Sequence, residues 1–209
     1  FLLDWSGSMQ TILENTMKQL FNLVWFCRKV NIPFEVYAFT NDAWSLGKEI
    51  PDNTNSYSHY NNQELLDPSR LQEMKEGDIY IEGGFRMVNI LTSTARTKDL
   101  DRMMLNLWLQ TRAFRGAMYA YARKFALSGT PLNEAIISSG QITKQFIKTA
   151  KLQKCHVIVL TDGEGYHAQM NEKRESFYSG KEEMFVSQIS PWSTTIRVGS
   201  KSFISKGSD

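Results

Sequence analysis

The chain has 209 residues, of which 42% are hydrophobic, and this suits one α/β domain with a substantial core. Its formal net charge of +2 excludes a strong field for binding polyanions. No apolar run approaches the length of a membrane span, and we expect the given residues to include no signal peptide; the first residue is not methionine. Because the first residues already form a predicted strand, we expect the chain to be a fragment of a longer protein.

The first eight residues, Phe-Leu-Leu-Asp-Trp-Ser-Gly-Ser, predict a buried parallel strand that ends in a polar loop. Asp4, Ser6 and Ser8 occupy alternate positions there, and Gly7 allows the backbone to turn. Ligands of open α/β sheets bind at this carboxyl edge. One carboxylate and two hydroxyls supply the oxygen ligands that Mg²⁺ prefers. The alternative is a helix N-terminus at which Ser and Asp act only as caps.

Residues 9–31 predict the first helix, with an apolar stripe along one side. The stripe consists of Leu13, Met17, Leu20, Val24 and Cys27. We expect further apolar residues to widen the buried face, namely Phe21, Leu23, Trp25 and Phe26. A second strand is expected at residues 34–40.

The middle of the chain changes in composition. Residues 48–77 are polar and lack a period, so we expect a long loop insertion that is either disordered or part of a partner-binding surface. Its last third, residues 67–76, has the signals of a short helix. Residues 78–92 predict a strand, a Gly-Gly turn and a second strand. A helix is expected at 99–112, and 116–127 either continue it or form another helix.

The second half begins with Ser-Gly-Thr-Pro-Leu at residues 128–132. Thr130 is expected to cap a helix that runs to about Lys151, with Pro131 at its first position. Residues 155–161 predict a buried strand that ends at Asp162. The charged residues 171–183 predict a surface helix or loop, and 194–198 a last strand. Cys27 and Cys155 have no metal-ligand spacing, and we expect buried, reduced thiols of a reducing compartment.

Asp4 and Asp162 bring two negative charges to one edge of the predicted sheet. Burial of either charge is costly, and the two repel each other. A divalent cation would offset both charges. The alternative is that both aspartates only cap helices.

Three stretches together carry a family resemblance. Asp-x-Ser-x-Ser, then Gly-Thr-Pro-Leu, then an apolar strand closing on Thr-Asp-Gly resemble the metal-ion-dependent adhesion site of the von Willebrand factor A family. The resemblance implies a Rossmann-like α/β fold over residues 1–209, with a mostly parallel central sheet flanked by helices on both faces. It also implies one bound Mg²⁺, or Mn²⁺, with metal ligands at Asp4, Ser6, Ser8, Thr130 and Asp162. Glu164 either contacts and orients these ligands without binding the metal itself or faces solvent.

A narrower resemblance concerns the start of the chain and residues 34–44. Leu-Leu-Asp-x-Ser-Gly-Ser-Met and Phe-Glu-Val-Tyr-Ala-Phe-Thr-Asn-Asp-Ala-Trp are similar to the A domain of the cobalt-chelatase T subunit and its relatives, including phage-encoded copies. Such domains commonly work beside a ring-forming AAA+ ATPase. The resemblance implies a metal-dependent protein–protein interaction module that accepts a Glu or Asp from its partner, in the cytoplasm or, if phage-encoded, in a virion. We expect the domain not to be catalytic itself, although a chelatase-like assembly could contain it.

Other function classes remain as alternatives. The first is a structural component of a large assembly, such as a virion, in which the metal site is vestigial. The second is an RNA-binding A domain of the Ro type, although we do not expect nucleic acid to be a partner. Its signal is a set of alternating basic and aromatic residues, which also suits a solvated basic helix face. The set comprises Arg112, Phe114, Arg115, Tyr119, Tyr121, Arg123, Lys124 and Phe125.

Two enzyme classes are disfavoured by particular residues. A haloacid-dehalogenase phosphatase needs a second aspartate two residues after Asp4, where this chain has Ser6. Binding of a nucleotide by a Gly-x-x-x-x-Gly-Lys loop is excluded because the chain lacks that motif. The three histidines are scattered, and no Ser-His-Asp triad can be read from the sequence.

Overall fold

The computed structural model describes most of the chain and divides it into two compact units. Unit 1 comprises Phe1–Tyr60 and Glu82–Tyr166, and unit 2 comprises Asn61–Ile81 and His167–Asp209. The expected single domain over residues 1–209 stays a prediction. The described residues are 1–41, 75–81, 85–116, 125–163, 165–189, 195–198 and 201–204, so most of the expected 48–77 insertion and its short helix lie outside them.

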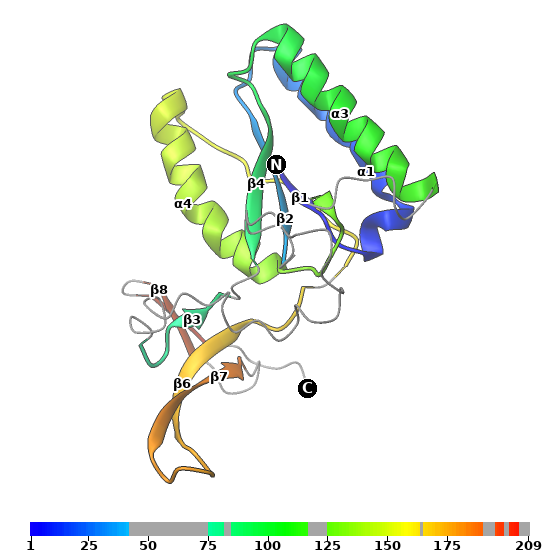
Figure 1. Ribbon diagram of the computed structural model, residues 1–209. Helices are drawn as coiled ribbons and strands as arrows, with labels where there is room; N and C mark the ends of the chain where they lie inside the picture. Colours follow the sequence, from blue (N-terminus) through cyan, green and yellow to red (C-terminus); the bar gives the residue numbers. More distant parts are fainter. Residues whose placement is uncertain are drawn as a thin grey trace. The chain divides into compact units, whose positions relative to one another are not determined.

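Unit 1 contains a four-stranded sheet in the order β4-β2-β1-β5. Its strands are β1 (Leu2–Asp4), β2 (Glu35–Thr40), β4 (Arg86–Thr92) and β5 (Val159–Leu160). The central strand β1 is parallel to both β2 and β5, while β4 is antiparallel to β2. This mixed α/β architecture with a mostly parallel sheet confirms the expected Rossmann-like fold class (Figure 1).

Helices α1 (Leu13–Lys29) and α3 (Thr97–Gly116) cover one face of this sheet, and a 3-10 turn, η1 (Ser8–Thr11), precedes α1. The predicted apolar stripe of α1 is buried against residues of the sheet such as Leu3. The expected widening of that stripe is wrong for Trp25 and Phe26, which are exposed. The stripe already fills the contact with the sheet, so these rings face away from it.

Helix α4 (Leu132–Ala150) packs on the opposite face, where Ala135 joins a second apolar cluster with Leu2 and Phe39. The two clusters lie on opposite faces because alternate side chains of a strand point in opposite directions. The expected cap at Thr130 is wrong: Pro131 is the N-cap residue, and no side chain caps this helix. The hydroxyl of Thr130 is therefore not engaged in capping.

Strand β5 is shorter than the predicted 155–161 segment and only half-buried. Among the described residues it pairs only with β1, so the preceding Val157 and Ile158 are exposed. Both cysteines are free thiols as expected, but only Cys27 is buried, while Cys155 is half-buried. Burial raises the pKa of the Cys27 thiol.

Unit 2 contains a three-stranded antiparallel sheet in the order β3-β6-β7 and a separate hairpin. The sheet consists of β3 (Ile79–Tyr80), β6 (Gln169–Glu175) and β7 (Glu182–Gln188), and the hairpin of β8 (Thr195–Val198) and β9 (Lys201–Ile204). The strand predicted at residues 194–198 is thus confirmed, but β9 follows it, so it is not the last strand. Both strands predicted within residues 78–92 are present as β3 and β4, but β3 pairs with β6 whereas β4 pairs with β2. The predicted Gly-Gly turn lies outside the described residues.

The expected helix or loop at residues 171–183 is also wrong, because this segment lies in the β6–β7 hairpin. Its strands carry charged side chains on both faces, so they lack the alternating apolar pattern by which a strand is predicted. At the tip, Phe177 and Tyr178 are 97% and 98% exposed and contact each other edge to face. A tight turn with Gly180 at φ +61° closes the hairpin.

Candidate metal centre

Asp4 is positioned by the pairing of β1 with its two parallel neighbours. Leu3 lies opposite Leu160, so the next residue pair along the two strands is Asp4 and Thr161. The Thr161 hydroxyl donates a hydrogen bond of 2.7 Å to Oδ2 of Asp4. On the other side Asp4 lies opposite Phe39, which brings the polar end of β2 to the same edge.

The two serines of the first loop connect this edge to Asp162. The hydroxyl of Ser8 donates to Oδ1 of Asp162 at 3.0 Å, and the hydroxyls of Ser6 and Ser8 are 3.0 Å apart. The structure thus brings Ser6, Ser8 and Asp162 into one hydrogen-bonded chain, as expected for a shared site.

The carboxylate of Asp4 is fully buried, and its Oδ1 has no hydrogen-bond partner among the described residues. Burial raises the pKa of Asp4 above its ordinary value of 3.8. The hydroxyls of Thr161 and Ser6 act in the opposite direction, while the negative charge of Asp162 raises the pKa further. A buried carboxylate oxygen without a donor is costly, and a cation at this position would remove that cost.

The Thr130 loop lies against the first loop through backbone contacts. The amide of Gly7 donates to the carbonyl of Ser128 at 2.7 Å, and the amide of Ser128 donates to the carbonyl of Trp5 at 3.3 Å. These bonds bring the second predicted stretch next to the first. The carbonyl of Thr130 accepts from the amide of Leu132 at 2.9 Å. The side-chain hydroxyl of Thr130 makes no hydrogen bond within the described part of the chain.

Two residues at this edge were not identified from the sequence. Thr161 contacts Asp4 directly, and its position between a predicted strand and Asp162 was the available signal. Asn41 follows β2, and its Oδ1 accepts from the amide of Gly129 at 2.8 Å. A Cβ atom at Gly129 would lie 2.5 Å from that oxygen, so glycine permits this close approach. Glu164 lies outside the described residues.

The donor set at this edge consists of oxygen atoms. Asp4 and Asp162 are its carboxylates, and hydroxyls provide its other side-chain oxygens. Within the described ranges, no three or more His, Cys, Asp or Glu side chains form a metal-binding group. A cation held here would therefore depend on hydroxyls and water, which suits Mg²⁺ or Mn²⁺ better than thiolate- or imidazole-seeking metals.

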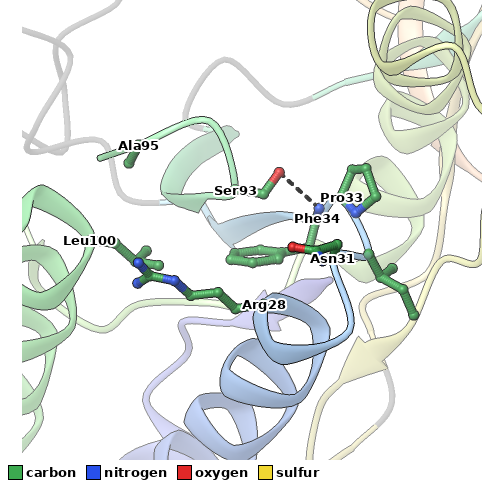
Figure 2. A pocket seen from close by; sticks show the side chains of 8 residues that line it. Arg28, Asn31, Pro33, Phe34, Ser93, Ala95 and Leu100 are labelled. Atoms are coloured by element: carbon green, nitrogen blue, oxygen red, sulfur yellow. Dashed lines mark hydrogen bonds between the residues drawn. The ribbon is translucent and has the colours of Figure 1, made fainter. Parts of the chain in front are cut away.

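Figure 2 shows a cavity of about 210 Å³ at the other end of the sheet, where α1 ends and β2 begins. Apolar side chains such as Phe34 and Leu100 line it, and Arg28 is the charged residue in its wall. Arg28 is already paired, through a hydrogen bond to Thr97 and an ion pair of 3.8 Å with Asp101. Nη1 of Arg28 makes no hydrogen bond among the described residues, but its charge is balanced by the ion pair with Asp101.

The alternating basic and aromatic residues of 112–125 were considered as a surface on which RNA bases could stack. The described members of this set do not form such a surface. Phe114 is buried and contacts Trp5 edge to face, with ring centroids 5.9 Å apart. Phe125 is half-buried and packs against the same core. The buried ring of Phe114 is not available to stack on a base, so the stacking interpretation is wrong for this residue. The other members, Tyr119, Tyr121, Arg123 and Lys124, lie outside the described residues.

Comparisons with protein-family models, with curated proteins and with solved structures found no match to the chain. In the described part of the chain, no helix combines the length and apolar character needed to cross a membrane.

Proposed function

We propose that unit 1 is an A-type domain of the von Willebrand factor family that binds one Mg²⁺ or Mn²⁺ and thereby recognises an acidic side chain of a protein partner. The observation that carries the proposal is the buried Oδ1 of Asp4, which has no hydrogen-bond partner among the described residues. The convergence of the Asp4, Ser128–Thr130 and Asp162 loops at one sheet edge supports it as well.

Each residue has a distinct part in this proposal. Asp4 and Asp162 supply negative charge, and Ser6, Ser8 and Thr130 supply hydroxyl oxygens. Thr161 holds Oδ2 of Asp4, which leaves Oδ1 as the oxygen for the cation. When bound, the cation supplies a Lewis-acidic position for a carboxylate oxygen.

The difference in burial between Asp4 and Asp162 indicates the side from which a partner would approach. Asp4 is fully buried beneath the loop, whereas Asp162 is exposed to solvent. A partner Glu or Asp would therefore reach the site from the Asp162 side. An AAA+ ATPase is the partner class that the sequence resemblance implies, and the domain itself would have no catalytic step.

A structural role in a large assembly is the second candidate. One observation favours it: the tip of the β6–β7 hairpin exposes Phe177 and Tyr178 almost completely. Pairs of exposed aromatic side chains are frequent anchors of protein interfaces. Assembly that is insensitive to chelators would support this role over the metal-dependent one.

Calorimetric titration of Mg²⁺ and Mn²⁺ into the metal-free protein tests the first proposal. The wild type should bind one cation, and Asp4→Ala and Asp162→Ala should abolish binding. Asp99→Ala is the matched control, because Asp99 is a half-exposed aspartate on α3 that pairs only with the exposed Arg96 among the described residues. Absence of binding by a folded wild type, or binding that survives both site substitutions, would contradict the proposal.

A further inference from the structure

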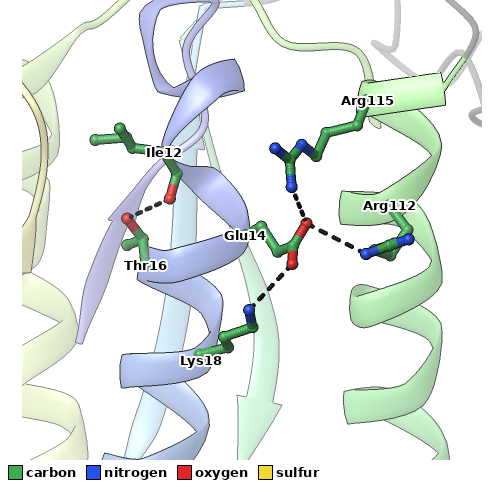
Figure 3. A network of polar contacts seen from close by, with 6 residues as sticks. All are labelled: Ile12, Glu14, Thr16, Lys18, Arg112 and Arg115. Carbon is green, nitrogen blue, oxygen red and sulfur yellow. Dashed lines mark hydrogen bonds and ion pairs between the residues drawn. The ribbon is translucent and has the colours of Figure 1, made fainter.

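A cluster of charged side chains joins the start of α1 to the end of α3. Figure 3 shows Glu14 at its centre, with three cationic side chains directed toward its carboxylate. Arg115 donates to Oε2 at 2.7 Å, Arg112 contacts the same oxygen at 3.5 Å, and Lys18 contacts Oε1 at 3.1 Å. Both oxygens of one carboxylate are thus occupied by cations.

The cluster carries more positive than negative charge. Glu14 is the one carboxylate that these three cations contact within the described residues, so an excess of two positive charges remains. The Glu14 side chain is only 10% exposed, whereas those of Lys18, Arg112 and Arg115 are 53%, 57% and 59% exposed. The excess charge therefore lies on the solvent side of the buried carboxylate.

The scaffold under the cluster is fixed by contacts of neighbouring residues. The side-chain amide of Gln10 donates through Nε2 to the backbone carbonyl of Phe114 at 2.9 Å. This bond holds the last turns of α3 next to the N-terminal end of α1. The edge-to-face contact between Phe114 and Trp5 anchors the same turn in the core. Lys18 lies over the ring of Trp108, with Nζ 5.7 Å from the ring centroid. Glu14 then orients both arginines, so less side-chain freedom is lost when a ligand binds.

We propose that Lys18, Arg112 and Arg115 bind the terminal phosphoryl group of a phosphate monoester or diphosphate. Each guanidinium has five N–H donors, and the contact with Glu14 leaves most of them available. A phosphate monoester carries about −1.5 to −2 charges at neutral pH, which matches the excess of the cluster. A phosphodiester carries a single charge per phosphate, so a nucleic-acid backbone matches it less well. None of these three residues is a proposed ligand of the metal centre.

NMR titration with inorganic phosphate and with pyrophosphate, at constant ionic strength maintained with chloride, tests the proposal. We expect saturable shifts of the Trp108 indole and of the Arg112 and Arg115 Nε–H signals. Dimethyl phosphate, a diester, should shift them at least about tenfold more weakly, because it offers one charge instead of two. Equal affinity for the diester, or the absence of saturation with phosphate and pyrophosphate, would overturn the proposal.

Substitutions locate the binding site. Arg115→Gln and Arg112→Gln should each weaken phosphate binding about tenfold, since each removes a charged hydrogen-bond donor. Arg102→Gln is the control, because Arg102 is an exposed arginine on α3 outside the cluster. If Arg115→Gln fails to fold, Arg112→Gln decides, since its longer contact with Glu14 makes it the milder change. Unchanged affinity in Arg112→Gln would contradict the assignment.

Discussion

Asp4 and Glu14 are both buried carboxylates of unit 1, yet their pKa values move in opposite directions. Burial raises the pKa of Asp4, and the negative charge of Asp162 adds to this effect. Hydrogen bonds from Arg115 and Lys18 lower the pKa of Glu14 from its ordinary 4.5 to about 2. Burial decides the direction at Asp4, whereas at Glu14 the hydrogen bonds from cationic side chains outweigh burial.

The comparison also separates two kinds of charge imbalance. At Asp4, the described neighbours are hydroxyls and another carboxylate, so negative charge is in excess and a cation is the complementary ligand. At Glu14, three cations surround one carboxylate, so the complementary ligand is an anion. Substitutions that neutralise each carboxylate should therefore have opposite effects on the unliganded protein.

The largest effect is expected from Asp4→Asn, which should weaken Mg²⁺ or Mn²⁺ binding by more than about a hundredfold, because it removes a ligand charge. The same substitution should raise the Tm of the metal-free protein at neutral pH, since a neutral amide avoids the cost of a buried charge and keeps an oxygen for Thr161. Calorimetric titration and thermal unfolding measure the two effects. A lower Tm of the metal-free variant would show that the ionised Asp4 carboxylate does not destabilise the folded protein. The surface control is Asp99→Asn.

A smaller effect is expected from Thr161→Val, which removes the hydroxyl that holds Oδ2 of Asp4. Groups that orient a metal ligand contribute about tenfold or more to affinity, so we expect cation binding to weaken by about that factor. Thr161→Ser keeps the hydroxyl and should retain near wild-type affinity. Equal losses of cation affinity in Thr161→Val and Thr161→Ser would show that the Thr161 hydroxyl does not contribute to cation binding.

Glu14→Gln should lower the Tm, in contrast to Asp4→Asn. The amide keeps the shape of the side chain, but it leaves Lys18, Arg112 and Arg115 without the charge that holds them together. The matched control is Arg96→Gln, whose partner is Asp99 at 2.8 Å but whose side chain is 88% exposed. That control should cost no more than about 1 kcal/mol of unfolding free energy. A Glu14→Gln effect no larger than the control's would show that the cluster is not stabilising.

The smallest effect is expected in the pH dependence of the Tm differences between the wild type and the Asp4→Asn and Glu14→Gln variants. Glu14 has a lowered pKa in the folded state, so its stabilising contribution is complete above pH 4.5 and declines as the pH falls toward 2. Asp4 has a raised pKa, so its contribution is favourable below pH 3.8 and is lost as the pH rises through its folded value. The Tm difference between wild type and either variant should therefore shrink as the pH falls from 7 to 3. Differences that stay constant with pH would contradict both assignments.

Features set by local sequence could be predicted. The apolar run of β1, the stripe that α1 buries and the helix after Pro131 each follow from spacing within one segment. The order of three loop motifs also placed Ser6, Ser8 and Asp162 together, and their hydrogen bonds bear this out.

Features set by pairing between distant segments could not be predicted. The contact of Thr161 with Asp4 depends on the register between β1 and β5, which no single segment specifies. The pairing of β3 with β6 rather than with β4 depends on the same kind of information. Trp25 and Phe26 look like core residues by composition, but their exposure is decided by where the stripe meets the sheet.

The position of β1 between β2 and β5 also has a consequence for folding kinetics. β1 pairs with β2 across a single helix, whereas its other partner, β5, follows most of unit 1 in the sequence. Since closing the longer loop costs more chain entropy, we expect β5 to dock after the transition state. Interactions formed that late change the unfolding rate rather than the folding rate. A cation shared by Asp4 and Asp162 would thus prolong the lifetime of the folded domain without making it fold faster.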